Sequence, residues 1–134
     1  MKFRALLALS ALAVAGIAAA HHSFAMFDSE HQIKLEGEVT DFIWQNPHVY
    51  IHLKAPNPKA KGKMQEWTIE CANPGILNRT GWKFNMIKKG DRITTVVAPL
   101  RTGEPGALLK AVKIADGRKF GNGGPAGPAT IPID

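Results

Sequence analysis

The residues best suited to chemistry in this 134-residue chain are histidines in its first half. His21 and His22 are adjacent and follow an apolar run directly, whereas His48 and His52 lie four residues apart. Imidazole nitrogens bind transition metals, and nitrogen-rich planar sites suit Cu(II). On a strand, at about 3.3 Å per residue, His48 and His52 would lie about 13 Å apart on one face. We therefore expect only one of them to share an ion with the N-terminal pair, and both His52 and His31 to be surface residues.

The segment before His21 decides whether its α-amine is free. Lys2 and Arg4 precede Ala5–Ala20, an uncharged run that ends in three alanines. This pattern is typical of a secretory signal peptide, and the run is shorter than the roughly 20 residues that cross a bilayer. We expect residues 1–20 to be a signal peptide and the mature protein to be periplasmic or secreted, with no stable membrane anchor. A retained anchor is the alternative.

The cleavage position would decide the copper chemistry of the new N-terminus. Cleavage after Ala20 would let the amine and ring of His21 bind one ion. A second imidazole would then complete the three-nitrogen ligand set of a histidine brace. Cleavage after Ala19 would let the amine, two amide nitrogens and the His22 ring bind Cu(II) or Ni(II) in a square plane. We therefore name His21, His22 and His48 as candidate metal ligands and copper as the candidate cofactor. The alternative is that polar residues merely follow a signal peptide.

His48 is preferred over His52 as the second imidazole because of its sequence neighbours. Pro47 fixes the backbone that enters the strand, and Trp44 and Asn46 flank the same turn. A histidine in this position has a rigid support for its ring. It could equally form only a hydrogen bond within the turn.

Aromatic residues near this turn suggest a ligand-binding face. Tyr50 and Trp44 could stack a sugar, a base or a peptide ring, as aromatic side chains do on OB-fold strands. They could instead pack beneath an N-terminal arm through Phe24 and Phe27, which would cover the open face of a small barrel. The possible ligand-face residues are Trp44, Asn46, Tyr50 and His52.

The other reactive side chains have weaker signals. Cys71 is the only cysteine, so no intramolecular disulfide can form, and its strand phase beside Trp67 and Ile69 indicates an inert buried thiol. Glu66 and Glu70 share a strand face, where Lys or Arg would be their ordinary cross-strand partners. The sequence contains no nucleophile elbow, HExxH, CxxC or glycine-rich phosphate loop. An enzyme would therefore depend on the histidines alone.

Alternating apolar residues predict three strands in the first half of the domain. These strands read QIKLEGEV from Gln32, HVYIHL from His48, and QEWTIEC over Gln65–Cys71. Gly37 falls on the inner face of the first strand, where a missing side chain allows a bend or bulge.

A short helix interrupts the strands. Asn73 as N-cap and Pro74 at the first helical position begin it, and Gly81 ends it after two turns. The strands RITTVVAPL and ALLKAVKIA follow, and Asp116-Gly117 is a turn signal that can fold Arg118–Phe120 back. Three strands, a helix and two strands is the order of an OB-fold, an all-β, five-stranded Greek-key barrel. Another small β-barrel or sandwich is the alternative.

Composition divides the mature chain into three parts. We expect residues 21–32 to form an N-terminal arm, residues 33–120 the barrel domain, and residues 121–134, rich in Gly and Pro, a disordered tail. Loss of Lys2 and Arg4 with the signal peptide lowers the formal charge of +6 by two, and the remaining basic residues are scattered. We therefore exclude nucleic acid as a partner and expect a metal ion, a small ligand or an unidentified protein.

Several segments together resemble a family of small exported bacterial proteins of unknown function, which share the pattern HHSF…WxNPH…GW…GD. The segments are HHSFAMFD, LEGEVTDFIWQNPHVYIHL, WTIE, PGILNRTGW, GDRITTVVAPLRTGEPGALL and DGR. The resemblance covers the mature chain except its tail. It implies an exported, β-rich, OB-like domain and brings no activity with it.

These observations favour an exported, non-catalytic binding protein that binds Cu(II) through a mature N-terminal histidine. One alternative is an OB-type module for a glycan, a peptide or a partner protein. Another is a small copper redox enzyme, which would need an open axial position and a broad substrate surface that so small a domain hardly provides.

Overall fold

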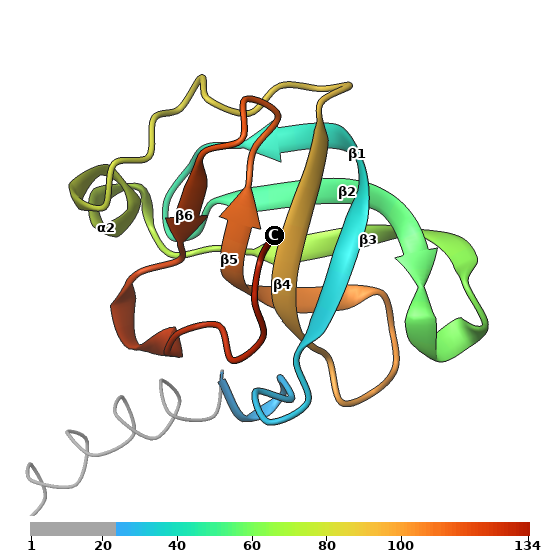
Figure 1. The fold of residues 1–134 in the computed structure, drawn as a ribbon. Helices are drawn as coiled ribbons and strands as arrows, with labels where there is room; N and C mark the ends of the chain where they lie inside the picture. Colours follow the sequence, from blue (N-terminus) through green and yellow to red (C-terminus); the bar gives the residue numbers. More distant parts are fainter. Residues whose placement is uncertain (1–23) are drawn as a thin grey trace, which may run out of the picture.

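The computed structural model describes residues 24–134, in which five strands close into a barrel (Figure 1). His21, His22 and the expected signal peptide lie outside the described residues. The barrel strands are β1 (Ile33–Ile43), β2 (Tyr50–Asn57), β3 (Lys63–Glu70), β4 (Arg92–Pro99) and β5 (Gly106–Lys113). One short helix, α2 (Pro74–Arg79), lies between β3 and β4. The predicted all-β, five-stranded barrel with a helix after the third strand is confirmed. None of the helices in residues 24–134 has the length and apolarity that a membrane crossing requires.

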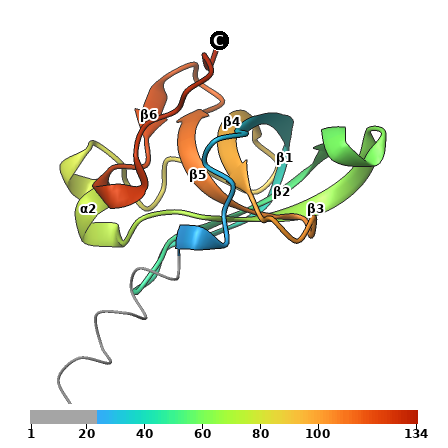
Figure 2. The same ribbon diagram turned by 90° about the horizontal axis from the view of Figure 1, so that it is seen from below.

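The strand pairing follows the Greek-key order of an OB-fold. β1 pairs antiparallel with both β2 and β4, β2 pairs with β3, and β4 pairs with β5. A parallel pairing of β3 with β5, from Thr68 opposite Gly106 to Glu70 opposite Leu108, closes the barrel. Figure 2 shows β2 and β3 running together to the 3-10 turn η1 (Pro58–Ala60) that joins them.

The alternation predicted for β2 and β3 fills the barrel interior. Six residues that the pattern assigned to the inner face belong to one buried apolar cluster: Val49, Ile51, Leu53, Trp67, Ile69 and Cys71. Leu35 and Val39 of β1 join them, and Ile33 packs against the cluster from its edge. The core therefore forms as period-two patterning requires.

Gly37 lies where β1 changes partners. It pairs with Ile93 of β4, and the next residue, Glu38, pairs with both Arg92 and Lys54. A Cβ on Gly37 would lie 2.1 Å from the Lys54 carbonyl oxygen. The missing side chain therefore allows two backbones to approach closely while β1 curves around the barrel.

The helix α2 begins with the cap that the sequence predicts. The Asn73 side chain accepts a hydrogen bond from the Ile76 N–H at 2.8 Å, and Pro74 is the first helical residue. Leu77 is fully buried and fixes the helix against the barrel core. The helix ends at Arg79, two residues before the glycine that we expected to stop it.

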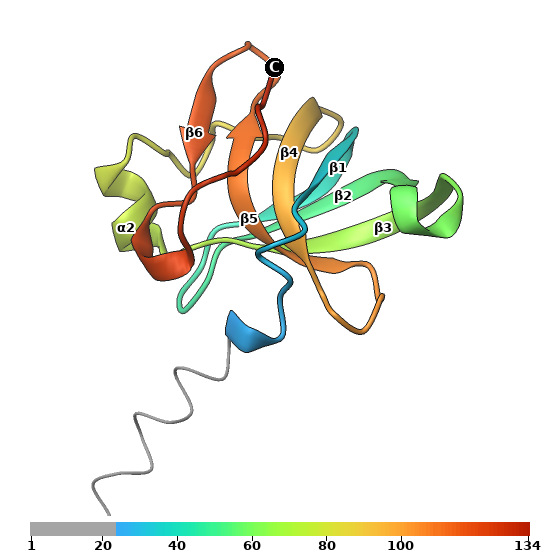
Figure 3. The same ribbon diagram turned by 60° about the horizontal axis from the view of Figure 1, so that its bottom comes forward.

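The C-terminal segment differs from the disordered tail that its composition predicts. After β6 (Lys119–Gly121), which pairs with β5, it forms the 3-10 turn η2 (Gly124–Ala126) and crosses the outer side of the barrel (Figure 3). Asn122 is 3% exposed, and its side chain accepts a hydrogen bond from the Ala72 N–H at 2.7 Å. Gly/Pro content describes intrinsic flexibility, whereas this contact depends on a polar side chain that composition does not reveal.

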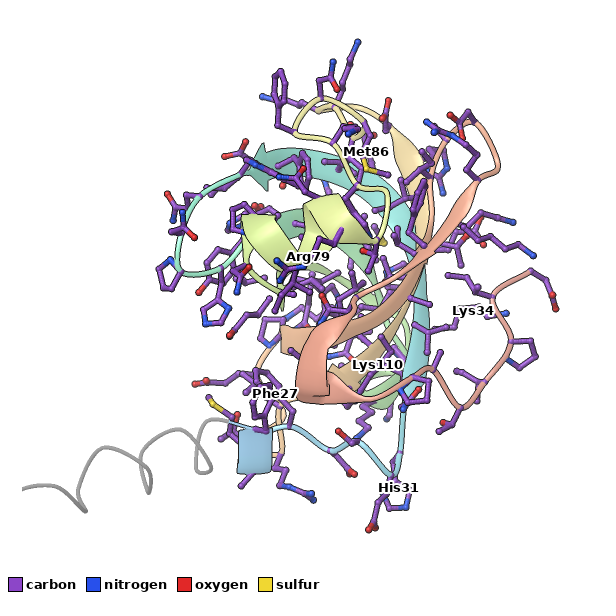
Figure 4. The ribbon with its side chains drawn as sticks, turned by 90° about the vertical axis from the view of Figure 1, so that its left-hand side faces the viewer. Phe27, His31, Lys34, Arg79, Met86 and Lys110 are labelled. Atoms are coloured by element: carbon purple, nitrogen blue, oxygen red, sulfur yellow. The ribbon has the colours of Figure 1, made fainter. Side chains whose placement is uncertain are left out.

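The N-terminal arm and the tail lie on the same side of the barrel. Phe27 packs with Ala98 and Leu108 of β4 and β5, and Lys110 donates a hydrogen bond to the Ala126 carbonyl of the tail. Figure 4 labels Phe27 and Lys110 on this side. Burial under the tail lowers the pKa of Lys110.

Candidate metal centre

His48 lies in the loop between β1 and β2, outside the strand in which the sequence predicts it. β2 begins two residues later, after a bend at Asn46–Pro47, whose peptide bond is cis. The backbone of Val49 nevertheless bonds to the end of β3: its N–H donates to the Ala72 carbonyl at 3.2 Å, and its carbonyl accepts from the Cys71 N–H at 2.8 Å. These two bonds fix the backbone beside His48 against the end of β3.

The ring of His48 lies between a backbone carbonyl and a carboxylate. Its Nδ1 is 3.2 Å from the carbonyl oxygen of Cys71, and since a carbonyl oxygen only accepts, Nδ1 carries the proton. Its Nε2 is 3.4 Å from Oε1 of Glu70. The two side chains are 40% and 28% exposed, so both can be reached from solvent. A neutral ring in this position presents its Nε2 lone pair, which is the arrangement of a metal-ligating histidine with its second nitrogen on a carbonyl.

A second hydrogen bond fixes the peptide group that holds the ring. The Cys71 carbonyl and the Ala72 N–H belong to the same peptide unit. Its carbonyl accepts from His48, and its N–H donates to Oδ1 of Asn122 at 2.7 Å. The tail therefore orients the acceptor on which the His48 tautomer depends.

A pocket of about 190 Å³ opens beside His48 and Glu70. Its wall is mostly apolar and comes from segments far apart in the sequence: Ile76 of α2, Leu108 of β5 and Ala126 of the tail. Phe24 also lines it, and Phe24 is the first residue that the structure describes. The end of the described chain and His48 thus meet at one pocket.

None of the four expected ligand-face residues lines this pocket. Trp44 packs against the core and meets the Phe42 ring edge-on at 5.9 Å between centroids. Asn46 is exposed at the bend. Tyr50 lies opposite Glu70 in the β2–β3 ladder, and its pKa is raised by burial and by the Glu70 carboxylate. We expected these aromatic residues to pack beneath the N-terminal arm. For Phe27 this expectation is wrong, because its side chain packs on β4 and β5 instead.

His52, the fourth ligand-face residue, forms a second and separate pair. Its Nδ1 lies 3.9 Å from Oε1 of Glu66, which also accepts a hydrogen bond from the Thr40 hydroxyl at 3.0 Å. His31 is a surface residue paired with Asp28, as expected. His48 and His52 therefore contact different glutamates.

Glu70 is the residue that sequence reasoning missed. We expected Lys or Arg beside Glu66 and Glu70, yet within residues 24–134 the basic side chain that meets each carboxylate is a histidine, at 3.4 Å from Glu70 and 3.9 Å from Glu66. In the ladder Tyr50 faces Glu70 and His52 faces Thr68, so each histidine lies diagonally across from its glutamate. The sequence does contain two histidines four residues apart and two glutamates four residues apart. Which histidine meets which glutamate can be predicted only once the register of β2 on β3 is known.

The described residues supply two groups of this candidate centre. Residues 24–134 contain no group of three His, Cys, Asp or Glu side chains that could hold a metal ion. His21 and His22, the other two candidate ligands, lie outside the described residues. A complete centre would therefore need the residues that precede Phe24.

Cys71 behaves as a core residue. Its side chain is 1% exposed, and burial, with a smaller contribution from the Glu70 carboxylate, raises the pKa of its thiol far above the ordinary value. The expectation of a buried thiol is confirmed. Its backbone carbonyl, rather than its sulfur, is the group that faces the candidate centre.

The sequence profile described as "Family of unknown function (DUF6152)" matches residues 8–109. The chain belongs to this family. The matched range includes His21, His22, His48 and Glu70 and excludes the tail, and the resemblance to a family without a known activity is confirmed. No curated protein matches this DUF6152 chain.

Among solved structures, this DUF6152 chain is similar to Rim1, a mitochondrial single-stranded DNA-binding protein from S. cerevisiae. The identity is 13% and the TM-score 0.45, over 63% of this chain and 92% of that chain. We withdraw our exclusion of nucleic acid as a partner, because it used charge averaged over the whole chain, and an average does not describe local grooves or aromatic side chains.

Proposed function

We propose that this protein is exported, that its mature chain begins at His21, and that it binds one Cu(II) ion. The ligands would be the α-amine and ring of His21 and Nε2 of His48. The observation that carries this proposal is the half-exposed His48 ring, whose Nδ1 faces the Cys71 carbonyl at 3.2 Å while Nε2 faces the Glu70 carboxylate at 3.4 Å. Imidazole held in this way is a good ligand for copper or zinc, and three nitrogens suit Cu(II).

The position of Phe24 supports the contribution of His21. Phe24 lines the same pocket as His48. An extended chain spans at most about 3.6 Å per residue, so three residues reach about 11 Å. His21 is therefore close enough in sequence to bring its amine and ring to Nε2 of His48.

Cleavage is essential to this function. While Ala20 precedes His21, the nitrogen of His21 is an amide and cannot bind Cu(II) as an amine. Cleavage one residue earlier would shift the site to the His22 ring and two amide nitrogens, which need no contribution from His48. The dependence of copper affinity on His48 therefore distinguishes the two cleavage positions.

The test begins with mass spectrometry of the N-terminus of the exported protein. The mature form, His48→Ala, His52→Ala and a form with one added N-terminal alanine are then titrated with Cu(II) against a competing chelator. We expect His48→Ala and the added alanine each to lower affinity at least about tenfold, since each removes a ligand. His52→Ala is the matched control and should stay within about twofold of the mature protein.

Other outcomes would contradict the brace. Unchanged affinity in both the His48→Ala and the alanine-extended forms would refute it, and a mature protein that begins at Ala20 would favour the His22 site. Binding of a glycan or peptide by metal-free protein would instead favour an OB-type module. Oxygen uptake with a turnover product after reduction by ascorbate would indicate a redox enzyme.

A further inference from the structure

We infer that the loop between α2 and β4, residues 80–91, docks on a membrane surface rich in anionic phospholipid. This loop and the β5–β6 turn lie at the same end of the barrel (Figure 1) and together line a pocket of about 400 Å³. Phe84 would enter the lipid surface, while basic side chains around the pocket would contact the phosphate groups. This pocket shares no described residue with the pocket beside His48, and the inference does not depend on copper.

The first argument is the exposure of Phe84. It is 68% exposed, the highest value among the large apolar residues in 24–134. The residues that hold the loop on either side of it are buried: Trp82 is fully buried and Ile87 is 3% exposed. The Trp82 indole N–H also donates to the Gly121 carbonyl at 2.9 Å. Phe84 therefore projects from a short segment whose two ends are fixed in the core.

Hydrogen bonds within the loop keep Phe84 in this position. The Met86 N–H donates to the Lys83 carbonyl at 3.2 Å, and the Lys83 N–H donates to the Met86 sulfur at 3.2 Å. These two bonds close a turn around Phe84, and Figure 4 labels Met86 at this end of the molecule. A side chain that an ordered turn presents needs little further ordering when it binds a partner.

The second argument is the charge around Phe84. Six basic residues belong to the loop or to residues 113–119 of the neighbouring hairpin: Lys83, Lys88, Lys89, Lys113, Arg118 and Lys119. The same two segments contain two acidic residues, and both are bound within their own turns. Asp91 accepts a hydrogen bond from the Lys88 N–H at 3.0 Å, and Asp116 pairs with Arg118 at 2.8 Å. Six basic and two acidic side chains leave a surplus of four positive charges beside an exposed ring.

The third argument is a repulsion that the described residues leave uncompensated. Lys113 and Lys119 lie directly opposite each other in the β5–β6 ladder. Like charges in this position destabilise a sheet. Neither lysine takes part in an ion pair within residues 24–134. An anionic surface would relieve this repulsion, and each lysine close to such a surface strengthens binding about fivefold.

The side chains of the loop favour a bilayer over a nucleic acid. Proteins that bind single strands stack successive bases on several aromatic side chains. The loop presents one exposed aromatic ring, and the other exposed aromatic residue in 24–134 is Phe24, which lines the separate pocket beside His48. A bilayer requires only apolar side chains at the acyl boundary and basic residues at the level of the headgroups.

The experiment measures how metal-free mature protein sediments with sucrose-loaded vesicles of phosphatidylcholine, with and without phosphatidylglycerol. We expect binding only to the vesicles that contain phosphatidylglycerol, and weaker binding as salt screens the charges. Phe84→Ala should lower the partition coefficient about tenfold, because one apolar side chain no longer leaves water. The triple variant Lys83→Gln/Lys88→Gln/Lys89→Gln should lower it about a hundredfold.

The β2–β3 hairpin supplies matched controls. It contains a 51% exposed Met64 and three exposed lysines, but no exposed aromatic residue. Met64→Ala and the triple variant Lys59→Gln/Lys61→Gln/Lys63→Gln remove the same kinds of group from this other hairpin. Both should stay within about threefold of the unsubstituted protein, since salt screens charges that lie more than a Debye length from the surface. All substituted side chains of both sets are exposed, and circular dichroism checks that each variant is folded.

Each other outcome contradicts the inference. Absence of binding to the anionic vesicles would refute it, and so would equal losses in the two triple variants, which would indicate an effect of net charge. Unchanged binding of Phe84→Ala would refute insertion of the ring. Binding of a single-stranded oligonucleotide that depends on Phe84, without vesicle binding, would assign the loop to nucleic acid instead. Because copper is absent throughout, these results and the test of the copper site are independent.

Discussion

Gly37→Ala tests whether the close backbone contact between β1 and β2 holds the barrel together. A Cβ at position 37 would lie 2.1 Å from the Lys54 carbonyl oxygen, 2.9 Å from the Lys54 carbonyl carbon and 2.9 Å from the Ala55 Cβ. Ordinary contacts of this kind exceed 3.4 Å, so the backbone must move by more than 1 Å within a closed sheet. Overpacking of a tight core costs roughly 1–3 kcal/mol, and a clash with main chain lies at the upper end of that range.

The expected result is a large loss of thermal stability. A cost of about 3 kcal/mol corresponds to a fall in Tm of at least about 10 °C for a domain of this size. Gly121→Ala is the matched control: Gly121 also lies in a strand, yet a Cβ there meets nothing within 4 Å. We expect its Tm to stay within about 3 °C or rise slightly. Circular dichroism during heating measures both. Equal Tm values for the two variants would refute the argument from close approach.

Two further predictions concern the wall of the pocket. Cys71 should react with a thiol reagent at least about a thousandfold more slowly in native than in denatured protein. The reason is that its side chain becomes exposed only when the core unfolds, which requires about 5 kcal/mol or more. Labelling of the native protein within tenfold of the denatured rate would contradict this. Asn122→Ala should lower the free energy of unfolding in urea by about 1–3 kcal/mol, since it leaves the half-buried Ala72 N–H without its acceptor. Asn78→Ala, at an exposed helix position, should change the free energy of unfolding by less than about 0.5 kcal/mol. Equal values for the two variants would contradict the role of Asn122 as the acceptor for the Ala72 N–H.

The barrel could be predicted from sequence because each element has a local signal. Alternation marks β2 and β3, the Asn73-Pro74 cap marks α2, and Gly37 marks the close approach of β1 to β2. The strand ends were less exact: β2 begins after His48 and continues to Asn57, because the bend before it delays the ladder. Patterning predicts which face a residue occupies, whereas the pairing of neighbouring segments decides where a strand starts.

The candidate centre was predictable only in part. His48 could be selected from its neighbours, but Glu70 could not, because its relation to His48 depends on the register between β2 and β3. Asn122 could not be selected either, since it lies in a segment whose composition indicates flexibility. Both residues contribute through contacts between segments distant in the chain, and a single sequence contains no signal for such contacts.

The hydrogen bonds around Cys71 connect the stability of the tail to the chemistry of the candidate centre. Oδ1 of Asn122 accepts from the Ala72 N–H, and the carbonyl of the same peptide unit accepts from Nδ1 of His48. Hydrogen bonds in such a chain polarise and orient one another, so the peptide is a stronger acceptor for His48 while Asn122 is bound. A tail that detaches would free this peptide to rotate and would remove the reason for His48 to keep its proton on Nδ1. The tail, which the family profile does not match, thereby helps to hold the available nitrogen of His48 towards Glu70.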